Sequence, residues 1–526
     1  EIKTLLAGEI YGGLMNFLTR VIRHVSPGWA ASRLRSEMQV QAYEAARPSR
    51  IHSAKRESRS ANNAVFAAGA SIREQARWLD ENHDLAIGIL DKLEERVVGA
   101  RGIQIEPQPM TKDGKVHEDF AAEIARLWDK WAESPEVTGN FSLAEAQRMM
   151  LRSAVRDGEV FAQMIRGPVN GVDYHSPVQF TFEMLEADFV PYSLTGTNQG
   201  VNTIQGVNVN AWNRPLSYNV YRYHPQSGLG PSRTKIIPAE RMLHLAVRKR
   251  LHQIRGISIF AGILQRLDDI KGYEDSERVA ARIAASLGFY IKRGDASVYG
   301  DDGGDWDEPE QKYRPFDMSA GTIYDGLAPG EELEMLESNR PNTNMLGFRN
   351  GQLRAAAAGT RTGYSSIARD YNGTYSAQRQ ELVESFEGYA VLQEWFVSRA
   401  ARPMYREWLK MLQLSGIRIP ANVDVESLYN ATYMAPVMPW IDPVKESNAW
   451  NTQIRGGAAT EAEWVRARGL NPRQVKTQRM REIEFNRRHD LVFDTDPAND
   501  KGDTTNEQAA RGAGGTHGKQ PDSGDE

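Results

Sequence analysis

The stretch Ala239–Ile291 reads AERMLHLAVRKRLHQIRGISIFAGILQRLDDIKGYEDSERVAARIAASLGFYI. Its first residues close a block of strand patterns. From Gly256 onward apolar residues recur at helical spacing, which predicts a long helix over residues 256–293. Gly272 is its weak point, since glycine costs about 1 kcal/mol relative to alanine inside a helix. This stretch therefore joins a β-rich block to a long helix.

The block before it combines helices with strands. Apolar spacing predicts helices over about 71–98, 121–133 and 142–158, with Ser142 and Glu145 as a capping box and Gly158 closing the last. Four runs, EVFAQMIR, VQFTFEML, IQGVNVNAW and LSYNVYRYH, are β-rich and are broken by Gly, Pro and Asn. We expect a mixed region with a substantial antiparallel sheet.

The block after it is mainly helical. A helix is expected near 344–358, followed by the polar stretch GTRTGYSSIARDYNGTYSAQRQ at 359–380. A long helix then runs from about Ser376 to Leu414, bent at Pro403. Three further helices begin with capping signals at Asp442-Pro443, Thr460 and Asn471-Pro472, and the last ends near Arg488. Beyond Asp490 the composition predicts a disordered acidic tail.

Bulk composition excludes several classes of protein. The chain has 526 residues, with 64 basic and 69 acidic side chains and a net charge of −5, so it shows no general bias toward nucleic acid. It has no cysteine, which excludes disulfides, thiolate metal sites and a cysteine nucleophile, and which fits a particle assembled in a cytosol. No segment is apolar enough to suggest a membrane span, and the first 25 residues lack a signal-peptide pattern.

The segment from Arg20 to Ser60 is basic. One interpretation is a solvated arm, and the other is an arm that touches neighbours or nucleic acid.

Motifs for catalysis are absent or incomplete. AGGTHGKQ at 513–520 lacks the first glycine and the hydroxyl residue of a phosphate loop. GYSSIA at 363–368 has Ile367 where a serine-hydrolase elbow needs glycine, so Ser365 and Ser366 are interpreted as turn and cap residues. The ten histidines have no metal-site spacing. We therefore expect no catalytic residue, no metal, no cofactor and no enzymatic activity, the profile of an assembly component.

An acidic run, DDGGDWDEPE at 301–310, lacks the spacing of a calcium loop. It is either a solvated loop or an acidic docking knob anchored by Trp306.

Several of these segments resemble the portal proteins of tailed phages, lambda type. The opening stretch carries His244, then Gln253, Arg255 and Gly256 before a long helix that ends in ARIAAS, as in that family. RDGEVF at Arg156, SYNVYRYHP at Ser217, SSIARDYNGTYSAQRQELVESF at Ser365 and PWIDPVKE at Pro439 are also similar. No single motif is diagnostic, but their order and spacing extend from about residue 70 to 488.

The resemblance implies an α+β, mainly helical portal fold with a wing of helices plus antiparallel sheet, two stem helices, an α/β clip and a helical crown. On this chain the implied parts are a basic arm (1–69), wing (70–255), first stem helix (256–293), clip (294–338), second stem helix (339–358), tunnel loop (359–375), wing helix and return (376–441), crown (442–489) and acidic tail (490–526).

The resemblance also implies a dodecameric ring at one capsid vertex, through which double-stranded DNA is packaged and ejected. Its partners would be the terminase large subunit, then a head-tail adaptor, and the major capsid protein, with no membrane. The protein would be assembled in the host cytoplasm and would reside in the virion. Twelve subunits would carry 12 × −5 = −60 charges, which lets DNA slide instead of being held by fixed cations.

Two sets of site residues follow from this resemblance. Candidates for contact with DNA in the channel are Lys271, Arg278, Arg282, Arg361, Arg369, Asn372, Tyr375 and Arg379. Candidates for docking terminase or the adaptor are Asp301, Asp302, Asp305, Trp306, Asp307 and Glu308. For the basic DNA-contact candidates, the alternative is an ordinary solvated helix face or an ion pair between subunits. For the docking candidates, the alternative is a solvated loop.

Two other functions remain open at this stage. One is a DNA-processing enzyme of the packaging machinery, which the lack of a phosphate loop disfavours. The other is a minor capsid or scaffold protein that does not form a ring.

Overall fold

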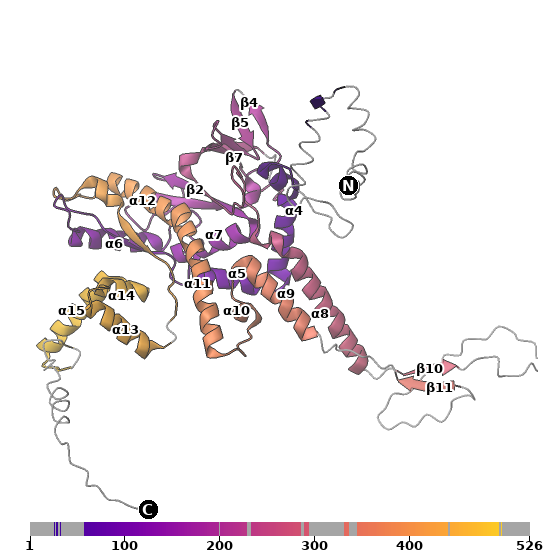
Figure 1. Ribbon diagram of the computed structural model, residues 1–526. Helices are drawn as coiled ribbons and strands as arrows, with labels where there is room; N and C mark the ends of the chain where they lie inside the picture. The colour runs from indigo at the N-terminus through magenta and orange to yellow at the C-terminus, as the bar shows by residue number, and fades with distance from the viewer. Residues whose placement is uncertain are drawn as a thin grey trace, which may run out of the picture. The chain divides into compact units, whose positions relative to one another are not determined.

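The computed structural model of the chain describes residues 57–198, 200–228, 233–285, 289–293, 331–335, 345–439, 442–493 and 496, together with 26, 28, 29 and 32. The chain divides into two compact units, residues 1–63 and 64–526. Within the described residues, the second unit carries all the sheets and most of the helices (Figure 1).

Within the described residues, four helices precede β2: α4 (Ala61–Asn82), α5 (Asp84–Val97), α6 (Glu118–Ala132) and α7 (Leu143–Asp157). The helical spacing seen over 71–98 is divided at His83, whose side chain accepts from the backbone N–H of Leu85 and so starts a new helix. The capping box of Ser142 and Glu145 and the left-handed Gly158 at the end of α7 are confirmed. The apolar faces of α5, α6 and α7 build the main core.

Two antiparallel sheets follow. One has the order β3-β2-β9, with β2 (Glu159–Arg166) between β3 (Phe180–Leu185) and β9 (Met242–Ala246). The other has the order β4-β5-β6-β7-β8. Its strands are β4 (Gly196–Asn198), β5 (Val201–Ile204), β6 (Val207–Val209), β7 (Pro215–Tyr221) and β8 (Thr234–Pro238).

The run IQGVNVNAW is therefore a hairpin of β5 and β6 rather than one strand. Gly206 forms its turn at φ 83°, where a side chain would strain the backbone. The expectation of a substantial antiparallel sheet is confirmed as two sheets.

A small third sheet joins distant parts of the chain. β1 (Gln104–Pro107) pairs antiparallel with β12 (Ala431–Met434). No pattern in the sequence predicted this pairing.

The helix expected over 256–293 is shorter in the structure. A 3₁₀ turn occupies Ile259–Gly262, α8 spans Leu264–Ala285, and Phe289–Arg293 is the strand β10, paired antiparallel with β11 (Glu331–Met335). The prediction was wrong at both ends, because FYIKR is β-rich and because Ser258 caps the 3₁₀ turn. The helix runs unbroken through Gly272.

The second long helical region begins with α9 (Met345–Thr360). It packs antiparallel on α8, with Arg349 paired to Glu274 at 2.5 Å and Phe348 against Tyr273. The polar stretch is not all loop, since it contains the short helix α10 (Tyr364–Ala368).

The long helix expected from Ser376 to Leu414 is confirmed as three consecutive pieces. They are α11 (Tyr375–Phe396), a π-helical turn (Val397–Ala401) and α12 (Arg402–Leu414). Pro403 has no N–H to donate, and the irregular turn lies directly before it.

Three capped helices form the last described part: α13 (Pro443–Arg455), α14 (Glu461–Ala467) and α15 (Pro472–Arg488). Asp442, Thr460 and Asn471 are their N-caps, and Thr460 forms the predicted capping box with Glu463. The fold is thus a mainly helical mixture of helices and antiparallel sheet. Within the described residues, no helix combines the length and apolar character needed to span a membrane.

Candidate functional site

Two motifs that are far apart in the sequence meet at the junction of α7, β2 and β9. Gly158, between α7 and β2, lies against the backbone of Gly256 and Ile257. A Cβ on Gly256 would lie 1.8 Å from the carbonyl oxygen of Gly158, and a Cβ on Gly158 would lie 2.4 Å from the carbonyl carbon of Ile257. Only glycine fits either position. RDGEVF and the Gln253–Gly256 motif are therefore two halves of one contact.

Glu159 is the centre of this contact. Its carboxylate is fully buried and accepts from Arg255 Nε at 2.7 Å, from His244 Nε2 at 3.0 Å and from the backbone N–H of Gly256 at 2.9 Å. The buried Arg255 guanidinium also donates to the carbonyl oxygens of Ala187, Val190 and Gln205 at 2.7–3.0 Å. A buried charge pair with these hydrogen bonds ties the loop before α8 to both sheets.

The protonation states around Glu159 follow from this geometry. Burial alone would raise the pKa of Glu159, but Arg255 and His244 hold it well below its usual range. Burial lowers the pKa of His244 to about 4, although its hydrogen bond to Glu159 acts in the opposite direction. At neutral pH the imidazole is therefore neutral and donates Nε2–H to a charged carboxylate. The arrangement holds the fold together through a buried ion pair and its hydrogen bonds.

A second cluster of charges lies beside it. Asp157 accepts from Arg77 at 2.7 Å, and the same guanidinium pairs with Asp188 at 2.5 Å. Glu186, Asp188 and His224 each place one possible metal ligand within 4.8 Å of the others. Since Arg77 already neutralises this group, a metal ion would have to displace it, and we interpret the group as an ion-pair cluster.

The polar stretch 359–380 forms a small cavity at the start of α11. Its volume is about 220 Å³, and its lining includes Ser365, Tyr371, Tyr375, Arg379 and Glu381. The Ser365 hydroxyl donates to Glu381 at 2.5 Å, and the Ser365 backbone N–H donates to the same carboxylate at 2.9 Å. This pair ties α10 to α11. The interpretation of Ser365 as a cap residue was wrong, because Gly363 is the N-cap of α10 and Ser365 lies inside that helix.

The DNA-channel candidates are divided between two places. Tyr375 and Arg379 line the cavity at the start of α11, and Tyr375 is exposed. Asn372 donates its backbone N–H to Asp370, one residue after Arg369. Arg361 and Arg369 adopt left-handed backbone conformations, with φ of 60° and 52°, at the ends of α9 and α10.

The other three candidates lie on α8 and already have partners within the chain. Lys271 donates to the carbonyl oxygen of Asn82 and lies over the ring of Trp78. Arg278 pairs with Asp275 on the same helix, and Arg282 donates to the carbonyl oxygen of Arg278 at 3.4 Å. These contacts match the solvated-face alternative, although exposed pairs of this kind are weak. The docking candidates Asp301, Asp302, Asp305, Trp306, Asp307 and Glu308 lie outside the described residues.

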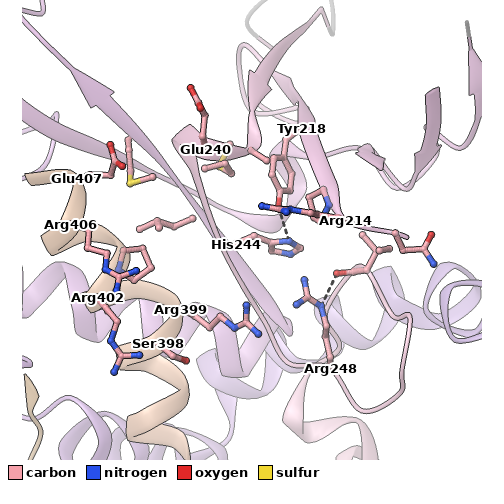
Figure 2. A pocket seen from close by; sticks show the side chains of 18 of the residues that line it. Arg214, Tyr218, Glu240, His244, Arg248, Ser398, Arg399, Arg402, Arg406 and Glu407 are labelled. Atoms are coloured by element: carbon pink, nitrogen blue, oxygen red, sulfur yellow. Dashed lines mark hydrogen bonds between the residues drawn. The ribbon is translucent and has the colours of Figure 1, made fainter. Parts of the chain in front are cut away.

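The structure adds a basic cavity that the sequence did not indicate (Figure 2). Its volume is about 1380 Å³, and it lies between the β6–β7 hairpin, the end of β9 and the helical run of α12. The basic side chains in its lining are Arg214, Arg248, Arg399, Arg402, Arg406 and Lys410. The acidic ones are Glu240, Glu407 and Glu426. Figure 2 shows Arg399 and Arg248 reaching toward the same space from opposite walls.

A helix-face signal could have revealed part of this cavity. Arg399, Arg402 and Arg406 follow i, i+3, i+7 spacing, which places them on one face of a helix. Arg214 and Arg248 come from segments that only the fold brings near them.

Comparison with known proteins gives consistent results. A family model described as phage portal protein, lambda family, matches residues 47–393 of this chain. A probable portal protein of Halomonas phage phiHAP-1 is 24% identical over 429 residues, which cover 80% of this chain and 81% of the relative.

Two solved structures are also similar. The neck of a native GTA particle with C12 symmetry has a TM-score of 0.45 at 13% identity, covering 77% of this chain and 94% of that one. The virion of a native gene transfer agent particle has a TM-score of 0.44 at 13% identity, covering 78% and 99%.

Proposed function

Because this chain belongs to the lambda family of phage portal proteins, we propose that it forms the ring at one capsid vertex through which double-stranded DNA is packaged and ejected. The family match over residues 47–393 carries this proposal. The matched region contains both halves of the Gly158–Gly256 contact and the whole polar stretch 359–380. The family is a structural one, and the motif search found no phosphate loop or serine elbow that would favour an enzyme.

The parts of a portal subunit are assigned to this chain as follows. The wing comprises the helices and two sheets of residues 70–255, together with the return of α11 and α12. The two stem helices are α8 and α9. Their antiparallel packing, through the ion pair of Arg349 with Glu274, supports this assignment. The clip takes residues 294–338, and the crown takes α13, α14 and α15.

The path of DNA is assigned to the ring axis, with the tunnel loop at 359–375 reaching toward it. Tyr371 and Tyr375 are both exposed at this stretch. Arg379 lines the adjacent cavity and supplies a positive charge near them. Few fixed cations per subunit are what a sliding contact requires, because each neutralised phosphate strengthens binding by releasing counterions.

The docking of terminase and then of the head-tail adaptor is assigned to the clip, with the acidic run at 301–310 as the contact. The chain would be assembled with the major capsid protein and would reside in the virion.

Imaging of the purified full chain tests the proposal. Negative-stain micrographs should contain rings with a central hole, and symmetry analysis should give their stoichiometry, expected to be twelve. Persistent monomers under all conditions would argue for a scaffold or minor capsid protein. Nuclease or ATPase turnover abolished by one acidic substitution would overturn the assignment.

A further inference from the structure

We propose that the basic cavity of Figure 2 is one half of the contact between neighbouring subunits, and that carboxylate side chains of a second copy of this chain fill it. The inference rests on the proposed ring. To the ring it adds one specific contact surface, the basic cavity, and the chemical group that this surface binds, a carboxylate.

The charges of the cavity are incomplete within one subunit. In the part of the chain that the structure describes, Arg214, Arg399 and Arg406 form no ion pair with a carboxylate, and all three are exposed. Arg402 has a carboxylate, that of Glu394, only at 3.4 Å. The buried Glu407 is occupied by Arg166 and Lys410, each at 2.6 Å. The lining therefore has more basic than acidic side chains, and an acidic group from outside the subunit would be attracted to it.

Arg248 likewise forms no ion pair with a carboxylate of the described residues. Part of this residue remains accessible through the mouth of the cavity, yet burial lowers its pKa, and the positive charge of Arg399 lowers it further. Its guanidinium donates to the carbonyl oxygen of Ile254 at 3.2 Å. An incoming carboxylate between Arg248 and Arg399 would relieve this repulsion and could accept from both.

The size and lining of the cavity favour a protein segment. Its volume of about 1380 Å³ exceeds the range of about 300–1,000 Å³ usual for small-molecule sites, which are also mainly apolar. Trp212 in its lining is 85% exposed, and Tyr429 and the arginines lie in the same lining. Tryptophan, tyrosine and arginine are the residues that dominate the energetics of protein–protein contacts.

The backbone also points to function at this surface. Arg399 lies in the π-helical turn Val397–Ala401, a rare conformation that is frequent at functional sites. The extra residue per turn shifts the direction of Arg399 relative to α11.

A second copy is favoured over DNA for two reasons. In a closed ring each subunit meets the next through two different surfaces, so a basic surface must find a complementary one elsewhere on the same chain. Carboxylates for such a surface are available elsewhere on the chain, since acidic residues outnumber basic ones by 69 to 64 despite this local excess of arginine. Fixed arginines in such number would also hold a phosphate backbone and oppose sliding.

The first arm of the test measures ring assembly. The double variant R399Q/R406Q should require about tenfold more protein to form rings than the wild type, as judged by mass photometry, because charge pairs at an interface lose their partner. The control is Arg418→Gln, an exposed arginine on the segment after α12 that is outside the cavity. Circular dichroism of each variant verifies folding.

The second arm identifies the partner. The variant Arg406→Lys keeps the charge and supplies an amine for zero-length coupling to a carboxylate. Mixed rings of ¹⁴N- and ¹⁵N-labelled Arg406→Lys protein, treated with a carbodiimide, should yield cross-links between the amine introduced at position 406 and an Asp or Glu side chain of the other isotope. The Arg418→Lys variant should yield none at that position.

Each result decides the inference. Cross-links between isotopes together with weakened assembly support it. Rings of unchanged stability with cross-links confined to one chain overturn it, while the portal assignment stands. Unchanged rings with reduced DNA retention would assign the cavity to phosphate instead. If the wild type forms no ring at all, the proposed function fails first.

Discussion

The backbones of Gly158 and Gly256 touch, so that a Cβ atom on Gly256 would lie 1.8 Å from the carbonyl oxygen of Gly158. The two residues are almost a hundred positions apart, yet they place Glu159 and Arg255 side by side. This contact joins the end of α7 to the loop before α8. The wing and the first stem helix of the proposed portal subunit are therefore coupled through a buried ion pair.

Replacing Gly256 by alanine should destabilise the fold by more than about 3 kcal/mol, since the added methyl group meets backbone atoms that cannot rotate away. Urea denaturation followed by circular dichroism, at matched protein concentration, measures the change. The control is Gly272→Ala in α8, where a Cβ would meet nothing within 4 Å. It should stabilise by about 0.5–1 kcal/mol. Equal stability of the two variants would contradict the close approach.

Removing the guanidinium of Arg255 should cost about 3–5 kcal/mol, because Arg255→Met takes away the ion-pair partner at 2.6 Å from the buried Glu159 and leaves only Arg73, at 3.6 Å. Adding Glu159→Gln to this variant should recover part of the loss. A double-mutant cycle in urea measures the coupling between the two residues. Additive effects would show that the pair does not act as a unit.

Acid should weaken the fold through His244. Its pKa is about 4 in the folded protein and near 6.5 when unfolded, so between these values the unfolded chain binds the proton and the folded chain does not. Stability should therefore fall by up to about 3 kcal/mol as the pH drops from 6.5 to 4. Glu159, whose pKa is also lowered, adds to the loss at the acid end.

The variant His244→Gln retains an N–H donor for Glu159 but does not titrate. Urea midpoints measured from pH 4 to pH 7 should fall less steeply for this variant than for the wild type. Parallel curves would assign the acid sensitivity to other groups.

If Arg379 contacts DNA, Arg379→Gln should make DNA binding by purified rings less dependent on salt. The slope of log K against log salt should decrease in magnitude by up to about 0.9 for each subunit whose arginine reaches a phosphate. Filter-binding titrations at several salt concentrations measure the slope, with Arg418→Gln as the matched control. An unchanged slope would remove Arg379 from the DNA path.

Replacing Asp301, Asp302, Asp305 and Asp307 by serine should weaken the capture of terminase or of the head-tail adaptor in pull-down experiments. The control variant replaces Asp113, an exposed acidic residue in a turn of the wing. If the variant captures terminase and the adaptor as well as the wild type does, the acidic run is not their docking site.

The sequence alone determined the elements whose signals are local. The capping boxes at Ser142 and Thr460 and the N-caps Asp442 and Asn471 were read correctly, because each involves groups only a few residues apart. Family membership was also legible from the order of the motifs. The end of the helix predicted over 256–293 was misjudged, because a short run such as FYIKR fits a helix or a strand until its partner strand is known.

Only the tertiary structure decided which distant residues act together. Glu159 and Arg255 are 96 positions apart, and β1 pairs with a strand more than 300 residues away. The arginines of the basic cavity come from three separate segments. Local propensity carries no information about such pairs, because their energy arises from burial and charge once the chain has brought them together.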